Sequence, residues 1–234
     1  VADDGWINYN SFWDFDPGKF PNELYDASLQ AEQMGSRFGL WLGPRGGYGT
    51  EGTIASYIAN HGLGSRNPNS GNDINISDAR YLNKLRDDIF IGYQDKFNIN
   101  YWKLDGMGGA CLNPDHGHMT GGYCDMYYIS DMWEKWIDLF EDVRAARNAE
   151  GRELFINATN GTTLSPWILQ WVNTVWLNMG DDTGTLGTGE LQQQKIYYRD
   201  QAYYNQFDNT NQVQFPLGHV YNHDPIYASS DGSE

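Results

Sequence analysis

Three segments of the chain run from apolar residues directly into aspartate. Residues 101–106 read Tyr-Trp-Lys-Leu-Asp-Gly, and residues 1–6 and 174–182 make the same transition. Such short apolar runs are typical of buried parallel strands, whose carboxyl ends meet at one edge of a sheet. In α/β barrels that edge carries the catalytic side chains. For any one segment the alternative is a structural ion pair, but three of them together predict an active site.

The strand that ends at Asp105 also carries a lysine two residues earlier. Lys103 and Asp105 fall on the same side of a strand because side chains alternate with a period of two. A buried lysine beside a buried aspartate keeps the carboxylate ionised. We therefore expect Asp105 to be a charged group aimed from the strand end.

Strand-like and helix-like segments alternate along the chain, which is typical of βα units around a parallel sheet. The expected strands are one ending at Asp4, then 38–42, 101–105, 154–157, 174–177 and 213–217. The expected helices are 22–36, 77–97, 125–150, 166–171 and 190–204, with a long surface loop over 46–75. Leu24, Leu29 and Met34 are the expected apolar face of the first helix, and Ser77 is the expected cap of the second.

These six strands, joined by right-handed crossovers, are too few to close an eight-stranded barrel. The predicted fold is α/β, an incomplete (β/α)8 TIM barrel that forms a single catalytic domain over residues 1–234. The chain begins inside an apparent strand with Val1 rather than Met, so we expect a piece truncated at both ends.

Charge and composition indicate which classes of ligand the chain can bind. A formal net charge of −16 argues against binding nucleic acid or an anionic membrane surface, and no apolar run approaches the ~20 residues of a membrane span. Aromatic residues make up 15% of the chain, with 9 Trp and 16 Tyr, which fits a neutral polyhydroxylated ligand. An ordinary acidic enzyme with a Tyr-rich surface is the alternative. Cys111 and Cys124 either form a short-loop disulfide in an exported protein, secreted or periplasmic, or stay as thiols.

Four motifs together resemble a known family. They are Asp-Asp-Gly-Trp at 3–6, Phe-Gly-Leu-Trp at 38–41, Trp-Lys-Leu-Asp-Gly at 102–106 and Gly-Asp-Asp-Thr at 180–183. In this order they resemble the α-galactosidase (melibiase) barrels of glycoside hydrolase family 36 and related enzymes of clan D. The resemblance implies that the chain spans about barrel strands two to seven.

The resemblance also implies roles for individual residues. Asp105 matches the catalytic nucleophile and Asp181 the catalytic acid/base. The implied substrate-binding residues are Asp3, Asp4, Trp6, Trp41, Lys103, Asn157, Asn160 and Asp182. The implied reaction is hydrolysis of a terminal α-galactose-type residue of an oligosaccharide or glycoconjugate with retention of configuration. Neither a cofactor nor a metal is expected, and an oligomer is possible.

The two catalytic carboxyl groups need different protonation states, one ionised and the other neutral. Retention requires one ionised carboxylate that attacks the anomeric carbon and one protonated carboxyl that donates to the leaving oxygen, roughly 5 to 7 Å apart. Asp182 adds negative charge beside Asp181 and so favours its protonated form. A helix N-cap is the alternative role for Asp182.

The chain departs from the family where the sugar substituent is selected. Residues 157–163 replace the usual glycine-rich motif and its Arg, and residues 43–47 lack the usual Pro-Glu. Asn157 and Asn160 are expected near the C2 substituent, although a tight turn at Asn160 is the alternative. The sugar therefore stays open between galactose, galactosamine and N-acetylgalactosamine. The alternatives to this function are an α-glucosidase-like barrel, an endo-acting α-N-acetylgalactosaminidase and a non-catalytic carbohydrate-binding barrel.

Overall fold

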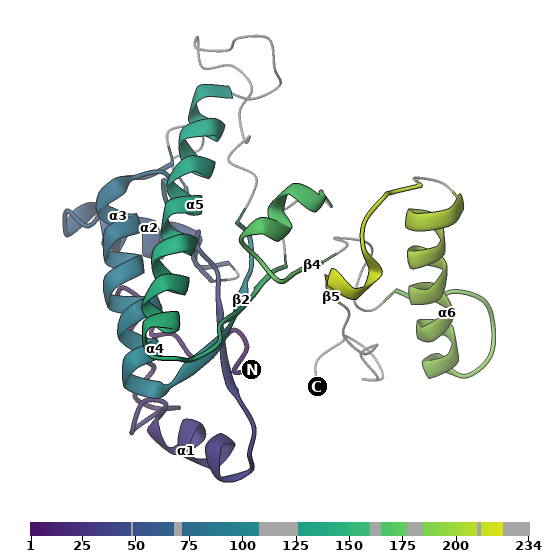
Figure 1. The fold of residues 1–234 in the computed structure, drawn as a ribbon, viewed down its shortest axis with the longest axis horizontal. Coiled ribbons are helices and arrows are strands. Elements are labelled where there is room, and N and C mark those ends of the chain that lie inside the picture. The colour runs from purple at the N-terminus through teal and green to yellow at the C-terminus, as the bar shows by residue number, and fades with distance from the viewer. Residues whose placement is uncertain are drawn as a thin grey trace.

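A computed structural model shows a chain built around one parallel sheet (Figure 1). The structure describes residues 1–47, 49–67, 72–107, 126–159, 165–176, 184–209 and 212–221. Within these ranges, no helix is both long and apolar enough to cross a bilayer.

The sheet has five strands, all parallel and in the order of the sequence. They are β1 (Phe38–Leu42), β2 (Ile99–Leu104), β3 (Phe155–Ala158), β4 (Thr174–Trp176) and β5 (Val220–Tyr221). The predicted parallel α/β class is confirmed. The first expected strand is reduced to one parallel bridge from Ala2 to Leu40.

The last strand begins later in the sequence than predicted. The expected range 213–217 is not a strand; Pro216 instead precedes a single 3₁₀ turn, η4 (Leu217–His219), that leads into β5. Proline has no N–H to give to a sheet ladder, which explains why the apolar run before it does not pair.

The helices mostly follow the expected pattern. They are α1 (Tyr25–Gln33), α2 (Glu51–Asn60), α3 (Ala79–Lys84), η1 (Leu85–Ile91), α4 (Gly92–Phe97), α5 (Met126–Ala149), η2 (Pro166–Gln170), α6 (Leu191–Tyr204) and η3 (Asn205–Asn209). The helix α2 lies inside the range predicted as a loop. Its Ile54, Ala55 and Ile58 form a buried face at helical spacing, which outweighs the Gly- and Asn-rich flanks.

The predicted face of the first helix is wrong. Leu24 is buried, but Leu29 is 53% exposed and Met34 is 83% exposed. Leu24 is the N-cap and Met34 the C-cap of a helix shorter than expected, so neither belongs to the helix interior. The buried residue of α1 is Ser28.

The two faces of the sheet differ in character. Sequential parallel strands joined by right-handed crossovers place the connecting helices on one face. Apolar strand residues on that face are buried: Leu40, Leu42, Trp102, Leu104 and Ile156. In Figure 1, α3, α4 and α5 lie along this side of β2, whereas α6 stands beyond β5. The opposite face carries the alternate residues, and these include the predicted site.

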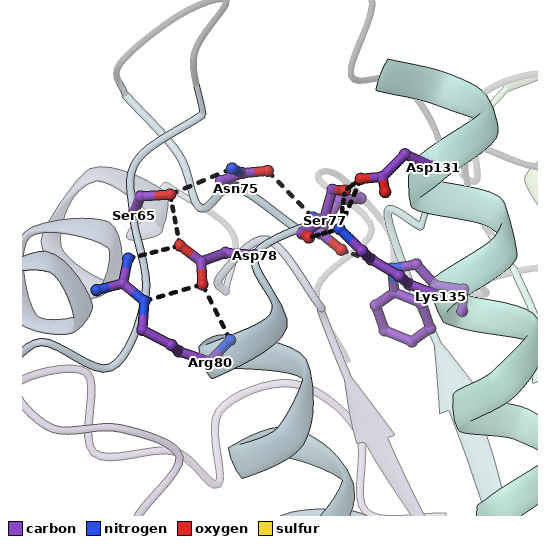
Figure 2. A network of polar contacts seen from close by, with 9 residues as sticks. Ser65, Asn75, Ser77, Asp78, Arg80, Asp131 and Lys135 are labelled. Atoms are coloured by element: carbon purple, nitrogen blue, oxygen red, sulfur yellow. Dashed lines mark hydrogen bonds and ion pairs between the residues drawn. The ribbon is translucent and has the colours of Figure 1, made fainter. Parts of the chain in front are cut away.

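A network of polar contacts joins the segment before α3 to α5 (Figure 2). Ser77 is not the cap of α3; its hydroxyl donates to Asp131 of α5, and the Lys135 ammonium lies 2.9 Å from the Ser77 carbonyl and 2.7 Å from Asp131. The Trp136 indole N–H donates to the Ile76 carbonyl at 3.0 Å. These bonds hold the long connection after β1 against the start of α5.

The cap of α3 is Asp78, one residue after the predicted position. Its side chain accepts hydrogen bonds from the Arg80 backbone N–H at 3.0 Å and from the Ser65 hydroxyl at 2.7 Å (Figure 2). Its carboxylate also pairs with the Arg80 guanidinium at 2.7 Å. Burial alone would raise the pKa of Asp78, but the hydrogen bonds from Arg80 and Ser65 outweigh it and lower the pKa to about 2.

We expect Asp78 to contribute to acid sensitivity. Its pKa is lower in the folded protein than the ordinary 3.8, so its stabilisation is present above that value and is lost as the pH falls through about 2. Asp78→Asn keeps a good N-cap and removes the charge. The variant should lose about 1 kcal/mol of unfolding free energy at neutral pH and show a shallower acid loss in urea titrations. Asp142→Asn, at an exposed ion pair with Arg86, is the control; equal slopes for both variants would contradict the assignment.

Candidate active site

Four of the predicted site residues lie on one row across the face of the sheet opposite the connecting helices. Trp41 of β1 is in register with Lys103 of β2, and Lys103 with Asn157 of β3. The bridge between Ala2 and Leu40 brings Asp3 beside Trp41. Residues in register on parallel strands point to the same side, so the fold gathers these side chains from segments far apart in the sequence.

Asp105 lies one step further toward the carboxyl edge. Its backbone N–H donates to the Leu42 carbonyl at 2.9 Å, which extends the ladder between β1 and β2 by one residue. Gly106 then takes a positive φ of 77° and turns the chain away. The Asp105 side chain is buried, and the Trp41 indole N–H donates to its Oδ2 at 3.2 Å. The carboxylate is therefore held in place by a neighbouring strand.

The two predicted tryptophans do not offer open ring faces. Trp41 is 1% exposed, so the expectation that its indole covers a sugar ring is corrected: its observed role is to donate a hydrogen bond to Asp105. Trp6 is equally buried and donates its indole N–H to the Trp41 carbonyl at 2.8 Å. Trp6 thus supports Trp41 from the core rather than lining a binding surface.

Lys103 does not pair with Asp105 as expected. Its ammonium lies 2.6 Å from Oδ2 of Asp3, and among the described residues Asp3 is the carboxylate within ion-pair distance. Asp3 follows the bridge between Ala2 and Leu40. The Lys103 ammonium therefore extends along the row toward Asp3 and not toward Asp105 at the carboxyl edge. Lys103 and Asp3 together present a positive and a negative group beside Asp105.

Asp4 is positioned by a residue that the motifs do not point to. The Tyr9 hydroxyl donates to Oδ1 of Asp4 at 2.6 Å, and the Gly5 N–H donates to the same oxygen at 2.8 Å. Burial, and next the Asp4 carboxylate, raise the pKa of Tyr9, so its hydroxyl stays protonated. Gly47 allows this arrangement, because an added Cβ there would lie 2.4 Å from the Tyr9 ring. No periodic pattern in the loop after Trp6 marks Tyr9.

Asn157 is fully buried and only partly satisfied by hydrogen bonds. Its Nδ2 donates to the Tyr101 hydroxyl at 3.0 Å, whereas its Oδ1 has no partner among the described residues. Thr174, its neighbour in register on β4, likewise has a buried hydroxyl without a partner. Burial raises the pKa of Tyr101 to about 12. Two buried polar atoms beside the row, Asn157 Oδ1 and Thr174 Oγ1, are thus without a hydrogen-bond partner among the described residues.

The connection after β1 is fixed from several sides. The Arg45 guanidinium pairs with the buried Asp73 carboxylate, with Nε 2.7 Å from Oδ2, and the Tyr81 hydroxyl donates to the Pro44 carbonyl. These contacts occupy Arg45, which stands in the segment where the resemblance led us to expect Pro-Glu. In this chain Arg45 holds the connection after β1 in place through its ion pair with Asp73.

The remaining predictions fall on residues outside the described ranges. These are the acid/base Asp181, the substrate-binding Asn160 and Asp182, and the cysteines Cys111 and Cys124. In the part of the chain that the structure describes, no three His, Cys, Asp or Glu side chains gather into a candidate metal site.

No family model matches the chain, and no curated protein matches its sequence. Solved structures do match. A double variant of the GH36 α-galactosidase from Geobacillus stearothermophilus, in complex with raffinose, aligns over 95% of this chain and 29% of its own, with 15% identity and a TM-score of 0.55. The α-galactosidase from Lactobacillus brevis aligns over 74% of this chain and 24% of its own, with 16% identity and a TM-score of 0.54.

These likenesses concern the fold. A single variant of the Geobacillus stearothermophilus enzyme, in complex with 1-deoxygalactonojirimycin, also matches, with 16% identity and a TM-score of 0.50 over 74% of this chain and 25% of its own. The chain therefore spans between 24% and 29% of the length of these three structures. The resemblance indicated by the four motifs is confirmed at the level of the fold.

Proposed function

We propose that the chain belongs to the catalytic domain of a retaining glycoside hydrolase that removes terminal α-galactose-type residues. The observation that carries this proposal is the buried Asp105 carboxylate at the carboxyl edge of a parallel sheet, held by the Trp41 indole N–H. The likeness to α-galactosidase structures supports it, and so does the sequential strand order, which suits a (β/α)8 barrel.

The proposed reaction has two displacements. In the first, the Asp105 carboxylate attacks the anomeric carbon, the bond to the leaving oxygen breaks, and Asp181 gives that oxygen its proton. In the second, Asp181 takes a proton from water, the water oxygen bonds to the anomeric carbon, and Asp105 leaves as carboxylate. Each displacement inverts the anomeric carbon, so the product keeps the configuration of the substrate.

The polar groups beside Asp105 suit the hydroxyls of a sugar. Asp3 and Lys103 form one ion pair, and Asp4 has one oxygen fixed by Tyr9 and Gly5, which leaves its other oxygen to accept from a ligand. We propose that these groups recognise the axial O4 and its neighbours. Asn157 and Asn160 are proposed to lie near the C2 substituent, and Asp182 is proposed to support Asp181.

The test is a panel of aryl α-glycosides given to the protein that carries this chain. Hydrolysis of the α-galactoside or the α-N-acetylgalactosaminide should exceed that of the α-glucoside, because an equatorial O4 would miss the Asp3 and Asp4 pair. A preference for the glucoside would overturn the galactose-type assignment. Binding of raffinose without hydrolysis of any substrate would instead indicate a carbohydrate-binding barrel.

Trp41→Phe should separate the hydrogen bond to Asp105 from packing. We expect kcat/KM on the preferred aryl glycoside to fall by about tenfold to a hundredfold, because a donor to a charged group contributes about 1.5–3 kcal/mol. The matched control is Trp102→Phe, whose indole is equally buried on the helix-covered face and donates to Gln94 at 3.2 Å. Both variants should lose thermal stability, and only Trp41→Phe should lose activity. Equal activity losses would show that packing alone matters.

A further inference from the structure

A cavity lies at the amino edge of the sheet, opposite the edge that carries Asp105. It encloses about 530 Å³ and is bordered by Asn100 near the start of β2, Phe155 at the start of β3 and Asn173 directly before β4. Asn100 precedes Asp105 by five positions on an extended strand, so these two residues lie about 16 Å apart. Its volume is within the usual range for sites that bind small molecules.

A positive charge without a counter-ion lines this cavity. Arg144 of α5 donates to the Leu154 carbonyl at 3.1 Å, the Trp171 carbonyl at 2.9 Å and the Asn173 amide oxygen at 3.4 Å. All three acceptors are neutral. Among the described residues no carboxylate lies within ion-pair distance of Arg144, and burial lowers its pKa. A partly buried guanidinium in this setting gains from an anionic partner.

Two further charged residues line the same space. Arg37 precedes β1, Glu153 precedes β3, and within the described part of the chain neither forms an ion pair. The cavity therefore carries two arginines against one glutamate, in a protein whose formal net charge is −16. The lining of the cavity is therefore net positive, whereas the whole chain is strongly negative.

The rest of the lining suits a sugar ring. The rings of Tyr101 and Phe155 stack with centroids 5.1 Å apart and planes within 6°, and Phe155 stays 37% exposed. An aromatic surface of this kind packs against the C–H face of a pyranose. Asn100, Asn148 and Asn173 add amides that can donate to and accept from hydroxyls.

We propose that this cavity binds an acidic sugar, with its carboxylate against Arg144 and Arg37 and its ring against the exposed face of Phe155. A neutral sugar would leave the two guanidinium groups uncompensated, and a bare anion would leave the aromatic and amide surface unused. The proposal concerns a site apart from Asp105 and does not depend on the proposed hydrolysis.

Calorimetric titration with galacturonate, galactose and acetate tests the proposal. Galacturonate should bind at least about tenfold more tightly than either control, because galactose lacks the charge and acetate lacks the ring. Galactose can also occupy the proposed active site, so the comparison is made on the affinity that Phe155→Ala removes. Equal loss of galactose and galacturonate affinity in that variant would remove the role of the arginines, equal binding of acetate would indicate a general anion site, and absent binding of galacturonate would refute the proposal. Asp105→Ala should leave galacturonate affinity unchanged, which distinguishes this cavity from the proposed active site.

Two variants locate the bound sugar. Arg37→Gln should weaken galacturonate binding by about tenfold and bring it near the affinity for galactose, while hydrolysis of an aryl α-galactoside stays unchanged. Phe155→Ala should weaken binding of galacturonate but not of acetate. Arg86→Gln, at an exposed ion pair on η1, is the control and should have no effect. Unchanged affinity in both Arg37→Gln and Phe155→Ala would place the ligand elsewhere and overturn the assignment.

Discussion

Asp105→Ala is expected to lower kcat/KM on an aryl α-galactoside by at least about a thousandfold. The variant loses the group proposed to bond to the anomeric carbon, and the remaining contacts with the sugar cannot replace that bond. The methyl group fits where the carboxylate lies, so the circular dichroism spectrum should change little, while the thermal midpoint should fall modestly because the buried Trp41 indole N–H loses its acceptor. Asp142→Ala removes an exposed carboxylate far from the sheet edge and should keep full activity.

Azide gives this prediction a stereochemical readout. In Asp105→Ala, azide can enter the vacated space, attack the anomeric carbon opposite the leaving group and release a β-galactosyl azide. Restored turnover with that product would support Asp105 as the nucleophile. Near-normal activity of Asp105→Ala without azide would show that the nucleophile lies elsewhere.

Asp181→Ala is expected to have the second largest effect, and its size should depend on the leaving group. Substrates with poor leaving groups, such as raffinose, need the donated proton, so their kcat/KM should fall by about 10² to 10⁴. Aryl substrates with acidic leaving groups should be much less affected in the first displacement. A uniform loss on all substrates would contradict an acid/base role.

The neighbour of Asp181 supplies the control. Asp182→Asn removes the second charge but keeps a side chain able to cap a helix. It should reduce activity less than Asp181→Ala and without dependence on the leaving group. In Asp181→Ala, azide should attack the glycosyl-enzyme and give an α-galactosyl azide, the opposite anomer to that from Asp105→Ala. If Asp182→Asn shows the leaving-group dependence instead, the two roles are exchanged.

Strong local patterns predicted the framework of the fold. Short apolar runs bounded by glycine and carboxylates indicated β1 to β4, because a buried parallel strand needs such a run. The helix α2 and the strand β5 were not predicted correctly. Their flanking sequences are rich in Gly, Asn and Pro, and burial against the rest of the chain decides their conformation.

The sequence predicted where several site residues lie better than it predicted which residues they contact. Alternation along β2 placed Lys103 and Asp105 on one face, but it could not show that Lys103 reaches Asp3 on a neighbouring segment. The motif likewise placed Trp41 beside the site, whereas only the tertiary structure shows a buried indole that donates to Asp105. Tyr9 lies in an irregular loop, and its contact with Asp4 follows from the fold of that loop.

Covalent trapping of the nucleophile tests the central claim most directly. A 2-deoxy-2-fluoro-galactosyl fluoride of α configuration slows hydrolysis of the glycosyl-enzyme more than its formation, so the labelled carboxylate accumulates and can be located by peptide mass spectrometry. Stoichiometric, time-dependent labelling of Asp105, prevented by competing galactose, is the result expected from a retaining α-galactosidase-type site. Labelling of a different carboxylate, in an enzyme that hydrolyses α-galactosides, would contradict it.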